Sequence, residues 1–263
     1  MKQILNLFIF LLVFLSCADE FVAENPIDPD NPDYIPPIVS FVSGPDPGET
    51  IYAENTIITF SGNESSMLYR SQLDSNGWSG WISSQSITLD YLDEGEHIIS
   101  LQGKYTTGDT SAVISIPFSV DAVAGPALLF SPRRHTAATG QMVTYQILAE
   151  EVYELAGTEF ILDYNPSKLE IEAIRQGGLF SSFGTPIFFS QNDPATGKLT
   201  ITSSAWAGTD QGFTGTGVII EIDVVLTQSG NSTINFNGNE VLRNPNNITI
   251  NISEAIGGFI TNP

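Results

Sequence analysis

Apolar and polar residues alternate along most of this chain with a period of two, starting near Ile38. Short runs rich in β-branched residues, such as residues 57–60 and 113–116, are separated by clusters of turn-forming residues, such as 93–95 and 107–109. Alternation of this kind is typical of half-buried strands, whereas a helix would repeat every 3.6 residues. Strands that recur about every 8–12 residues favour a β-sandwich. The pattern therefore predicts an all-β protein.

The predicted strands fall into two groups, which we interpret as two β-sandwich domains. The first, residues 38–122, is long enough for one immunoglobulin-sized sandwich. The second, residues 126–263, begins after Gly125 and contains nine predicted strands: 127–130, 142–149, 158–164, 169–174, 187–191, 199–204, 218–226, 233–236 and 248–252. Nine strands in a domain of this size predict a jelly roll or a similar two-sheet sandwich.

The N-terminal residues have a different pattern. Lys2 precedes a run from Ile4 to Leu15 that is apolar except for Asn6. This run is shorter than the roughly 20 residues of a transmembrane helix, so we interpret residues 1–16 as a signal peptide that is removed. Cys17 directly follows this predicted signal peptide and is the only cysteine of the chain. One interpretation is an ordinary signal peptide with an incidental cysteine after it.

The residues around the predicted cleavage site, Phe-Leu-Ser-Cys, resemble the lipobox of bacterial lipoproteins. The resemblance implies that Cys17 is lipidated and becomes the first residue of the mature protein. It also implies an exported lipoprotein at the outer membrane or cell surface, with a periplasm-facing orientation left open. The lipid anchor would be the only contact with the membrane.

Residues 17–37 contain the lipidated cysteine and an acidic segment rich in proline, which predicts an extended tether because such a segment cannot bury a core. The whole chain has 9 basic and 30 acidic residues, for a net charge of −21. A surface of this charge repels phosphate backbones, so we expect no binding to nucleic acid. The charge favours solubility and cationic partners.

The most specific motif of the chain lies in the second domain. Residues 155–170 read Leu-Ala-Gly-Thr-Glu-Phe-Ile-Leu-Asp-Tyr-Asn-Pro-Ser-Lys-Leu-Glu. They resemble the third and fourth strands of cohesin domains, where a strand ends in a Tyr-Asp-Pro-x-x-Leu turn; here Asn165 replaces the usual Asp. Segments 139–144, 197–201 and 215–222 resemble other cohesin strands in the same order. The resemblance implies a nine-stranded jelly roll that lacks catalytic chemistry and binds dockerin modules.

The same resemblance places the dockerin on a flattened face of one sheet. Alternation puts Phe160, Leu162 and Tyr164 in the core, so the neighbouring residues should face outward. The predicted partner-binding residues are Gly157, Glu159, Ile161, Asp163, Thr200, Thr202, Ser204 and Trp206. Of these, Gly157, Glu159 and Trp206 fall where dockerin-contacting residues of the family lie. They are not the residues usually found there, so the resemblance does not identify a standard dockerin. Trp206 has two interpretations: an interface anchor, or a ring packed under a loop.

The first domain resembles the immunoglobulin- or fibronectin-type modules of bacterial surface proteins, which usually act as spacers. The segments that carry this resemblance are 69–74, 77–81, 92–97 and 118–121. Trp78 and Trp81 are three residues apart, so alternation places them on different faces if their segment is a strand. One interpretation is a core Trp and a hairpin Trp. The other is a carbohydrate-binding site in which Trp78, Trp81 and Trp206 stack on sugar rings.

No motif predicts catalysis. The two histidines, His97 and His135, have no further His or Cys at the spacing that a zinc site needs, and no Gly-x-Ser-x-Gly elbow is present. We therefore expect no enzyme, no metal site and no cofactor. The leading hypothesis is a non-catalytic binding or scaffolding lipoprotein of the cell envelope, whose cohesin-like domain holds a dockerin-like protein. The alternatives are a polysaccharide-binding module of a polysaccharide-degrading system and a purely structural envelope protein.

Overall fold

The computed structural model describes residues 24–206 and 211–262. Within these ranges the chain is built from β-strands and a single short 3-10 helix, η1 (Phe180–Ser182), which confirms the predicted all-β class. The predicted signal peptide, residues 1–16, and Cys17 lie outside the described residues. None of the helical structure in the described ranges is long and apolar enough to cross a membrane.

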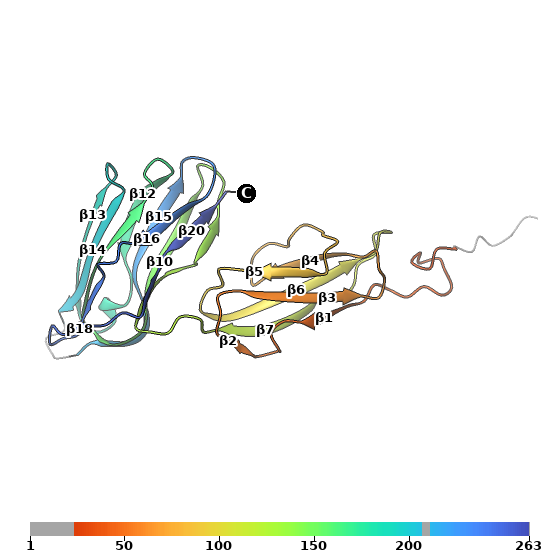
Figure 1. Cartoon of the computed structure of the whole chain (residues 1–263), viewed down its shortest axis with the longest axis horizontal. Helices are drawn as coiled ribbons and strands as arrows, with labels where there is room; N and C mark the ends of the chain where they lie inside the picture. Colours follow the sequence, from red (N-terminus) through yellow and green to blue (C-terminus); the bar gives the residue numbers. More distant parts are fainter. Residues whose placement is uncertain (1–23, 207–210, 263) are drawn as a thin grey trace, which may run out of the picture. The chain divides into compact units, whose positions relative to one another are not determined.

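Seven strands precede residue 123 and form two sheets (Figure 1). A three-stranded sheet has the order β1 (Val39–Ser43), β3 (Thr56–Gly62), β5 (Ser86–Leu89). A four-stranded sheet has the order β2 (Thr50–Ile51), β7 (Ile114–Val120), β6 (Gly95–Lys104), β4 (Leu68–Leu73). Alternate residues of β6, beginning with His97, are buried, as the period-two pattern predicts. The immunoglobulin or fibronectin assignment of these strands stays a prediction.

The chain forms two compact units. The first contains the residues up to Gly44 together with Ile58–Ile87 and Ile98–Ile116, and the second contains Pro45–Ile57, Thr88–His97 and the chain from Pro117 onward. In the described residues, each sheet takes its strands either from before residue 123 or from after it. The domain boundaries predicted at 38–122 and 126–263 stay a prediction.

The described part of the predicted tether is not extended, because residues 25–34 form three consecutive turns. The backbone N–H groups of Asp28, Asn31 and Tyr34 each donate to the carbonyl three residues earlier, at 2.9–3.0 Å. The side-chain oxygens of Asn25, Asp28 and Asn31 accept from the backbone N–H two residues later. Each of these residues precedes a proline, and an Asn or Asp followed by proline favours a turn. The repeated triplet therefore folds locally where composition alone predicted an extended chain.

The strands after residue 123 form a five-stranded and an eight-stranded sheet, both within the second unit (Figure 1). The first has the order β12 (Leu169–Gln176), β15 (Phe213–Leu226), β10 (Met142–Leu155), β8 (Ala127–Ser131), β19 (Glu254–Ile256). The second has the order β13 (Thr185–Asp193), β14 (Lys198–Trp206), β11 (Gly157–Tyr164), β16 (Ser232–Phe236), β20 (Gly258–Thr261), β9 (Arg134–Thr136), with β17 (Val241–Arg243) also beside β11 and β18 (Thr249–Ile250) beside β17.

All nine strands predicted for the second unit are present within these sheets. The strand expected at 248–252 is shorter and covers only Thr249–Ile250. Four strands were not predicted, namely β9, β17, β19 and β20. Each has three or four residues, which is too few for an alternating pattern to stand out from the surrounding loops.

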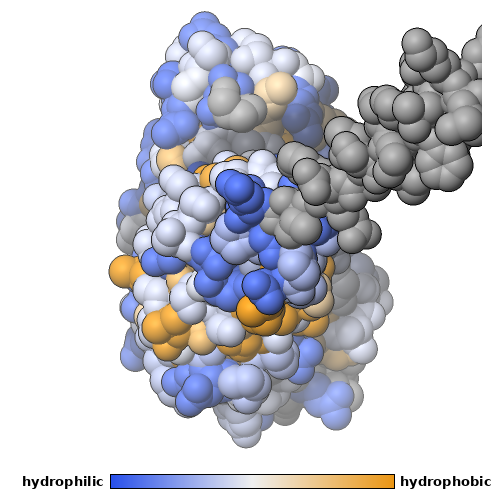
Figure 2. All heavy atoms as spheres, turned by 90° about the vertical axis from the view of Figure 1, so that its right-hand side faces the viewer, coloured by the Kyte–Doolittle hydropathy of each residue, from blue (hydrophilic) through white to orange (hydrophobic). Residues whose placement is uncertain are grey.

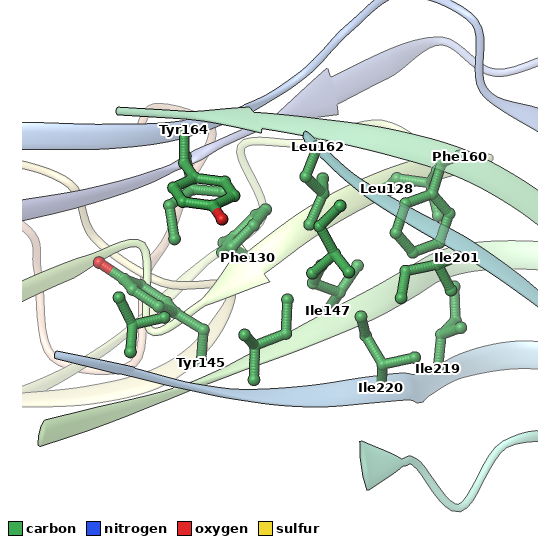
Figure 3. Close-up of a cluster of buried hydrophobic side chains, with 14 of the residues drawn as sticks. Leu128, Phe130, Tyr145, Ile147, Phe160, Leu162, Tyr164, Ile201, Ile219 and Ile220 are labelled. Carbon is green, nitrogen blue, oxygen red and sulfur yellow. The ribbon is translucent and has the colours of Figure 1, made fainter. Parts of the chain in front are cut away.

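The core of the second unit lies between its two sheets. Figure 3 shows Tyr145 and Ile147 from one sheet facing Phe160, Leu162 and Tyr164 from the other. The last three are the predicted core residues of β11, and at most 8% of each is exposed. Their burial confirms the predicted alternation. Because side chains along a strand point to alternate faces, these anchors fix which residues of β11 face outward.

The outer face of the five-stranded sheet carries a network of charged and polar side chains. Arg175 on β12 makes an ion pair with Asp223 on β15, and its Nη2 donates to the Asp223 carboxylate at 2.8 Å. The hydroxyl of Thr144 donates to the same carboxylate at 2.7 Å. The hydrogen bond from Arg175, supported by that from Thr144, lowers the pKa of Asp223 from 3.8 to about 2. Glu221 adds a second, longer contact to Arg175 at 3.3 Å.

This lowered pKa predicts how stability depends on pH. A carboxyl group whose pKa is lower in the folded state stabilises the fold above its unfolded-state pKa, and that contribution is lost as the pH falls through the folded-state pKa. We therefore expect Asp223 to contribute fully above pH 4 and to lose its contribution as the pH approaches 2. Urea unfolding midpoints between pH 2 and 7 measure this. The Asp223→Asn variant should be less stable at neutral pH and lose less stability on acidification, and a curve parallel to that of the wild type would contradict the assignment.

Candidate partner-binding face

The outward side chains of four neighbouring strands form one surface, which we call the open face. It is bounded by the edge strand β13 on one side and by the short strand β17 on the other. Its residues are Ile187, Phe189 and Gln191 on β13, Thr200, Thr202, Ser204 and Trp206 on β14, Gly157, Glu159, Ile161 and Asp163 on β11, and Val241 and Arg243 on β17.

The strand register aligns these side chains in rows across the sheet. In one row Glu159 pairs with Val241 on one side and with Thr202 on the other, and Thr202 in turn pairs with Phe189. In the next row Gly157 lies between Arg243 and Ser204, and Ser204 pairs with Ile187. Directly opposite residues of antiparallel strands point to the same side of the sheet, so each row contributes a line of neighbouring side chains to the open face.

A hollow of about 230 Å³ lies where the rows cross β11. Its lining includes Gly157, Glu159, Ser204, Val241 and Arg243. Gly157 has no side chain to fill this space, and a Cβ added there would come within 3.3 Å of the Ser204 Cβ. The hollow therefore exists because the residue at the centre of the second row is a glycine.

Large apolar side chains stand exposed around this hollow. Trp206 is 73% exposed, Phe189 is 68% exposed and Ile187 is 39% exposed. Most of the Trp206 surface is open to solvent among the described residues, and the choice between its two interpretations stays a prediction. Exposed aromatic residues beside a hollow are the usual arrangement of an interface anchor and its pocket.

The open face carries both acidic and basic side chains. Asp163 is paired with Lys198 at 2.9 Å, and Arg243 donates to the carbonyl of Asn247 at 3.1 Å. Glu159 is exposed in the middle of the sheet. Figure 2 shows one side of the molecule, on which hydrophilic and hydrophobic residues are mixed.

The structure brings all eight predicted partner-binding residues together on the open face, and their role in binding stays a prediction. Sequence reasoning missed Ile187 and Phe189 on β13 and Val241 and Arg243 on β17. In β13 the apolar residues are consecutive, so no alternation indicates which of them face outward. β17 has only three residues, so its position beside β11 had no signal in the sequence.

The rings of Trp78 and Trp81 both pack against Arg70. The guanidinium carbon of Arg70 lies 4.6 Å from the ring centroid of Trp78 and 4.7 Å from that of Trp81. The Lys104 ammonium is 4.5 Å from the Trp81 centroid, and Arg70 also donates twice to the side-chain oxygen of Gln102. The two tryptophans lie outside the strands, so the condition behind their predicted placement on different faces was not met.

These contacts change the carbohydrate hypothesis. Both indoles are half-buried, and cations pack against their rings, which stabilises the first unit and reduces the ring area that a sugar could use. Trp206 belongs to the second unit. The structure therefore gives no observation that favours a shared sugar platform of Trp78, Trp81 and Trp206.

The histidines make local contacts. His97 Nε2 lies 2.8 Å from the carbonyl of Asp93, and His135 Nε2 lies 2.9 Å from the carbonyl of Thr144. Burial lowers the pKa of His135. Within residues 24–206 and 211–262, no group of three His, Cys, Asp or Glu residues is arranged to hold a metal ion. The expectation of no metal, cofactor or catalysis stays a prediction.

Comparison with known proteins defines the class of the second unit. Residues 130–252 match the family model of the cohesin domain, which confirms the family resemblance predicted for this part of the chain. Cohesins are non-catalytic protein-binding domains with a β-sandwich jelly-roll fold, which confirms the predicted architecture of the second unit. The match also covers β11 and β14, which carry the predicted site.

Several solved cohesins are similar to about half of this chain. The sixth cohesin of Acetivibrio cellulolyticus scaffoldin B, in complex with a Cel5 dockerin mutant, has a TM-score of 0.46 and 12% identity, covering 53% of this chain and 100% of that one. A non-cellulosomal cohesin from Archaeoglobus fulgidus has a TM-score of 0.43 and 15% identity, covering 52% of this chain and 90% of that one. Type II cohesin A11 of Bacteroides cellulosolvens has a TM-score of 0.45 and 14% identity, covering 52% of this chain and 99% of that one. No curated protein matches the chain.

Proposed function

We propose that the open face is the docking surface for a dockerin-like protein and that the chain is a non-catalytic scaffolding protein. The observation that carries the proposal is the exposed pair Trp206 and Phe189 beside the hollow over Gly157. Cohesin domains bind dockerins, and the match at residues 130–252 brings that activity to this sheet as an expectation.

The partner differs in detail from a standard dockerin. The centre of the open face has one exposed carboxylate, Glu159, next to the hydroxyl groups of Thr202 and Ser204. A complementary partner would present a cationic or hydrogen-bonding side chain opposite Glu159 and an apolar side chain into the hollow. The chain's net charge of −21 would also speed encounter with a partner whose own docking surface is basic.

We further propose that the protein is held at the outer membrane or cell surface by a lipid on Cys17. The support is the apolar segment from Ile4 to Leu15 followed by the Ser16-Cys17 dipeptide. An anchor with more than one acyl chain holds a protein stably on a membrane. Such an anchor on Cys17 would therefore fix any bound partner at the surface of one cell. Incorporation of radiolabelled palmitate into the protein, lost in a Cys17→Ser variant, is the expected result.

Titration calorimetry tests the docking proposal, with the purified chain and dockerin modules encoded in the same genome. We expect at least one module to bind, and we expect Gly157→Leu to abolish binding because the new side chain fills the hollow. Glu172→Leu is the matched control, since Glu172 is exposed on β12 in the other sheet. The proposal fails if no module binds, or if the two leucine variants weaken binding to the same extent.

A further inference from the structure

The edge strand β13 has few of the features that usually protect a sheet edge. An edge strand presents a row of unpaired N–H and C=O groups, and proteins commonly guard it by shortness, charged residues, proline or a bulge. β13 has nine residues, six of them exposed. Its register with β14 continues without a shift from Thr185 to Asp193. Asp193, at the very end, is its only charged residue, and Pro186 lies near its start.

The other edges of these two sheets follow the usual rules. β9, at the opposite edge of the eight-stranded sheet, has three residues and includes Arg134. In the five-stranded sheet, β19 has three residues and includes Glu254. β12 is longer, but it contains charged residues and its register shifts between Ile171 and Ala173. Only β13 among these four strands is long, regular and almost uncharged, so its edge is suited to pair with another strand.

We infer that β13 pairs antiparallel with β13 of a second copy of this chain. The local composition of β13 favours this occupant, while the two acidic chains as wholes repel each other. A foreign strand attracted by the chain's net charge of −21 would be basic, but β13 has no acidic residue before Asp193 to receive it. A second copy supplies an equally uncharged strand. In an antiparallel pair centred on Phe189, Asp193 of each copy lies opposite Thr185 of the other, so no like charges meet.

The same pairing places Phe189 opposite Phe189 of the second copy, and aromatic pairs at such positions stabilise a sheet. The arrangement is two-fold symmetric, so both exposed edges are used up and the association closes at a dimer. The two-fold axis runs perpendicular to the sheet, so the open faces of both copies point to the same side of one continuous sheet. If the docking proposal holds, the dimer presents two docking surfaces side by side, but the pairing itself does not depend on partner binding.

Sedimentation velocity of the full chain at increasing concentration tests the pairing. We expect a monomer–dimer equilibrium that strengthens as salt is raised, because salt screens the repulsion between two acidic chains. Phe189→Lys should weaken the dimer at least about tenfold, since two lysines would lie directly opposite each other. Thr202→Lys is the matched control. It adds a lysine to the same row of the open face but one strand away from the edge, and we expect the dimer to persist.

A cross-linking experiment covers the case in which Phe189→Lys disturbs β13 itself. In a Cys17→Ser background, Phe189→Cys should form a disulfide-linked dimer on mild oxidation, because Cα atoms of directly opposed residues are about 4.5–5.5 Å apart, within disulfide range. Thr202→Cys should stay monomeric. A protein that remains monomeric at every concentration overturns the inference. Equal loss of the dimer in both lysine variants, or equal cross-linking of both cysteine variants, would show association through the open face and would also overturn it.

Discussion

Replacement of Phe160 by alanine is expected to lower the free energy of unfolding of the second unit by about 3–5 kcal/mol. The Phe160 side chain is completely buried between the two sheets (Figure 3). Its ring meets that of Phe236 edge-on, with the centroids 5.5 Å apart. The surrounding residues are held in strands and cannot collapse fully into the space left behind, so the variant loses both the transfer free energy and the packing contacts.

Glu159→Ala is the control for this prediction. Glu159 precedes Phe160 on β11 but is exposed on the open face, and surface substitutions of this kind usually change stability by less than about 0.5 kcal/mol. Urea unfolding is followed by tryptophan fluorescence in a Trp78→Phe, Trp81→Phe background, so that only Trp206 of the second unit reports. Similar midpoints for the two alanine variants would mean that the inward and outward faces of β11 are wrongly assigned.

The parts of the fold that sequence predicted well are the strands with one buried and one exposed side. In β11 and β14 the apolar residues alternate with polar ones because one side packs in the core. The alternation therefore indicated both the strands and their outward residues, including Glu159 and Thr202. The pairing of these two strands placed those residues in one row, so half of the open face followed from periodicity and a family resemblance.

The other half of the open face had no such signal. β13 is an edge strand that is exposed over most of its length. Its sequence therefore does not alternate between apolar residues on a buried side and polar residues on an exposed side. Arg70, which holds Trp78 and Trp81, comes from a neighbouring strand, and such a tertiary contact is invisible to local pattern. The turns at residues 25–34 depend on side-chain hydrogen bonds from Asn and Asp, which composition does not distinguish from an acidic tether.

Trp206→Ala is expected to weaken binding of the protein partner by about 2 kcal/mol or more, which is about 30-fold in Kd. Trp206 lies at the end of β14 opposite Thr185, with 73% of its surface exposed. A ring this open contributes little to the folded monomer, so its removal should leave the unfolding midpoint almost unchanged. Its area would be buried only in the complex, and the loss should therefore appear mainly in a faster dissociation rate.

Tyr153→Ala is the matched control, because Tyr153 is an exposed aromatic residue, at 67%, on β10 of the other sheet. Surface plasmon resonance with the dockerin module found by titration gives both rate constants. Binding unchanged by Trp206→Ala, or weakened equally by Tyr153→Ala, would remove Trp206 from the docking surface. The remaining outcome is that only Trp206→Ala loses binding, while the dimer formed through the β13 edges persists. That result would show that the partner binds the outward face of the sheet and the second copy binds the β13 edge.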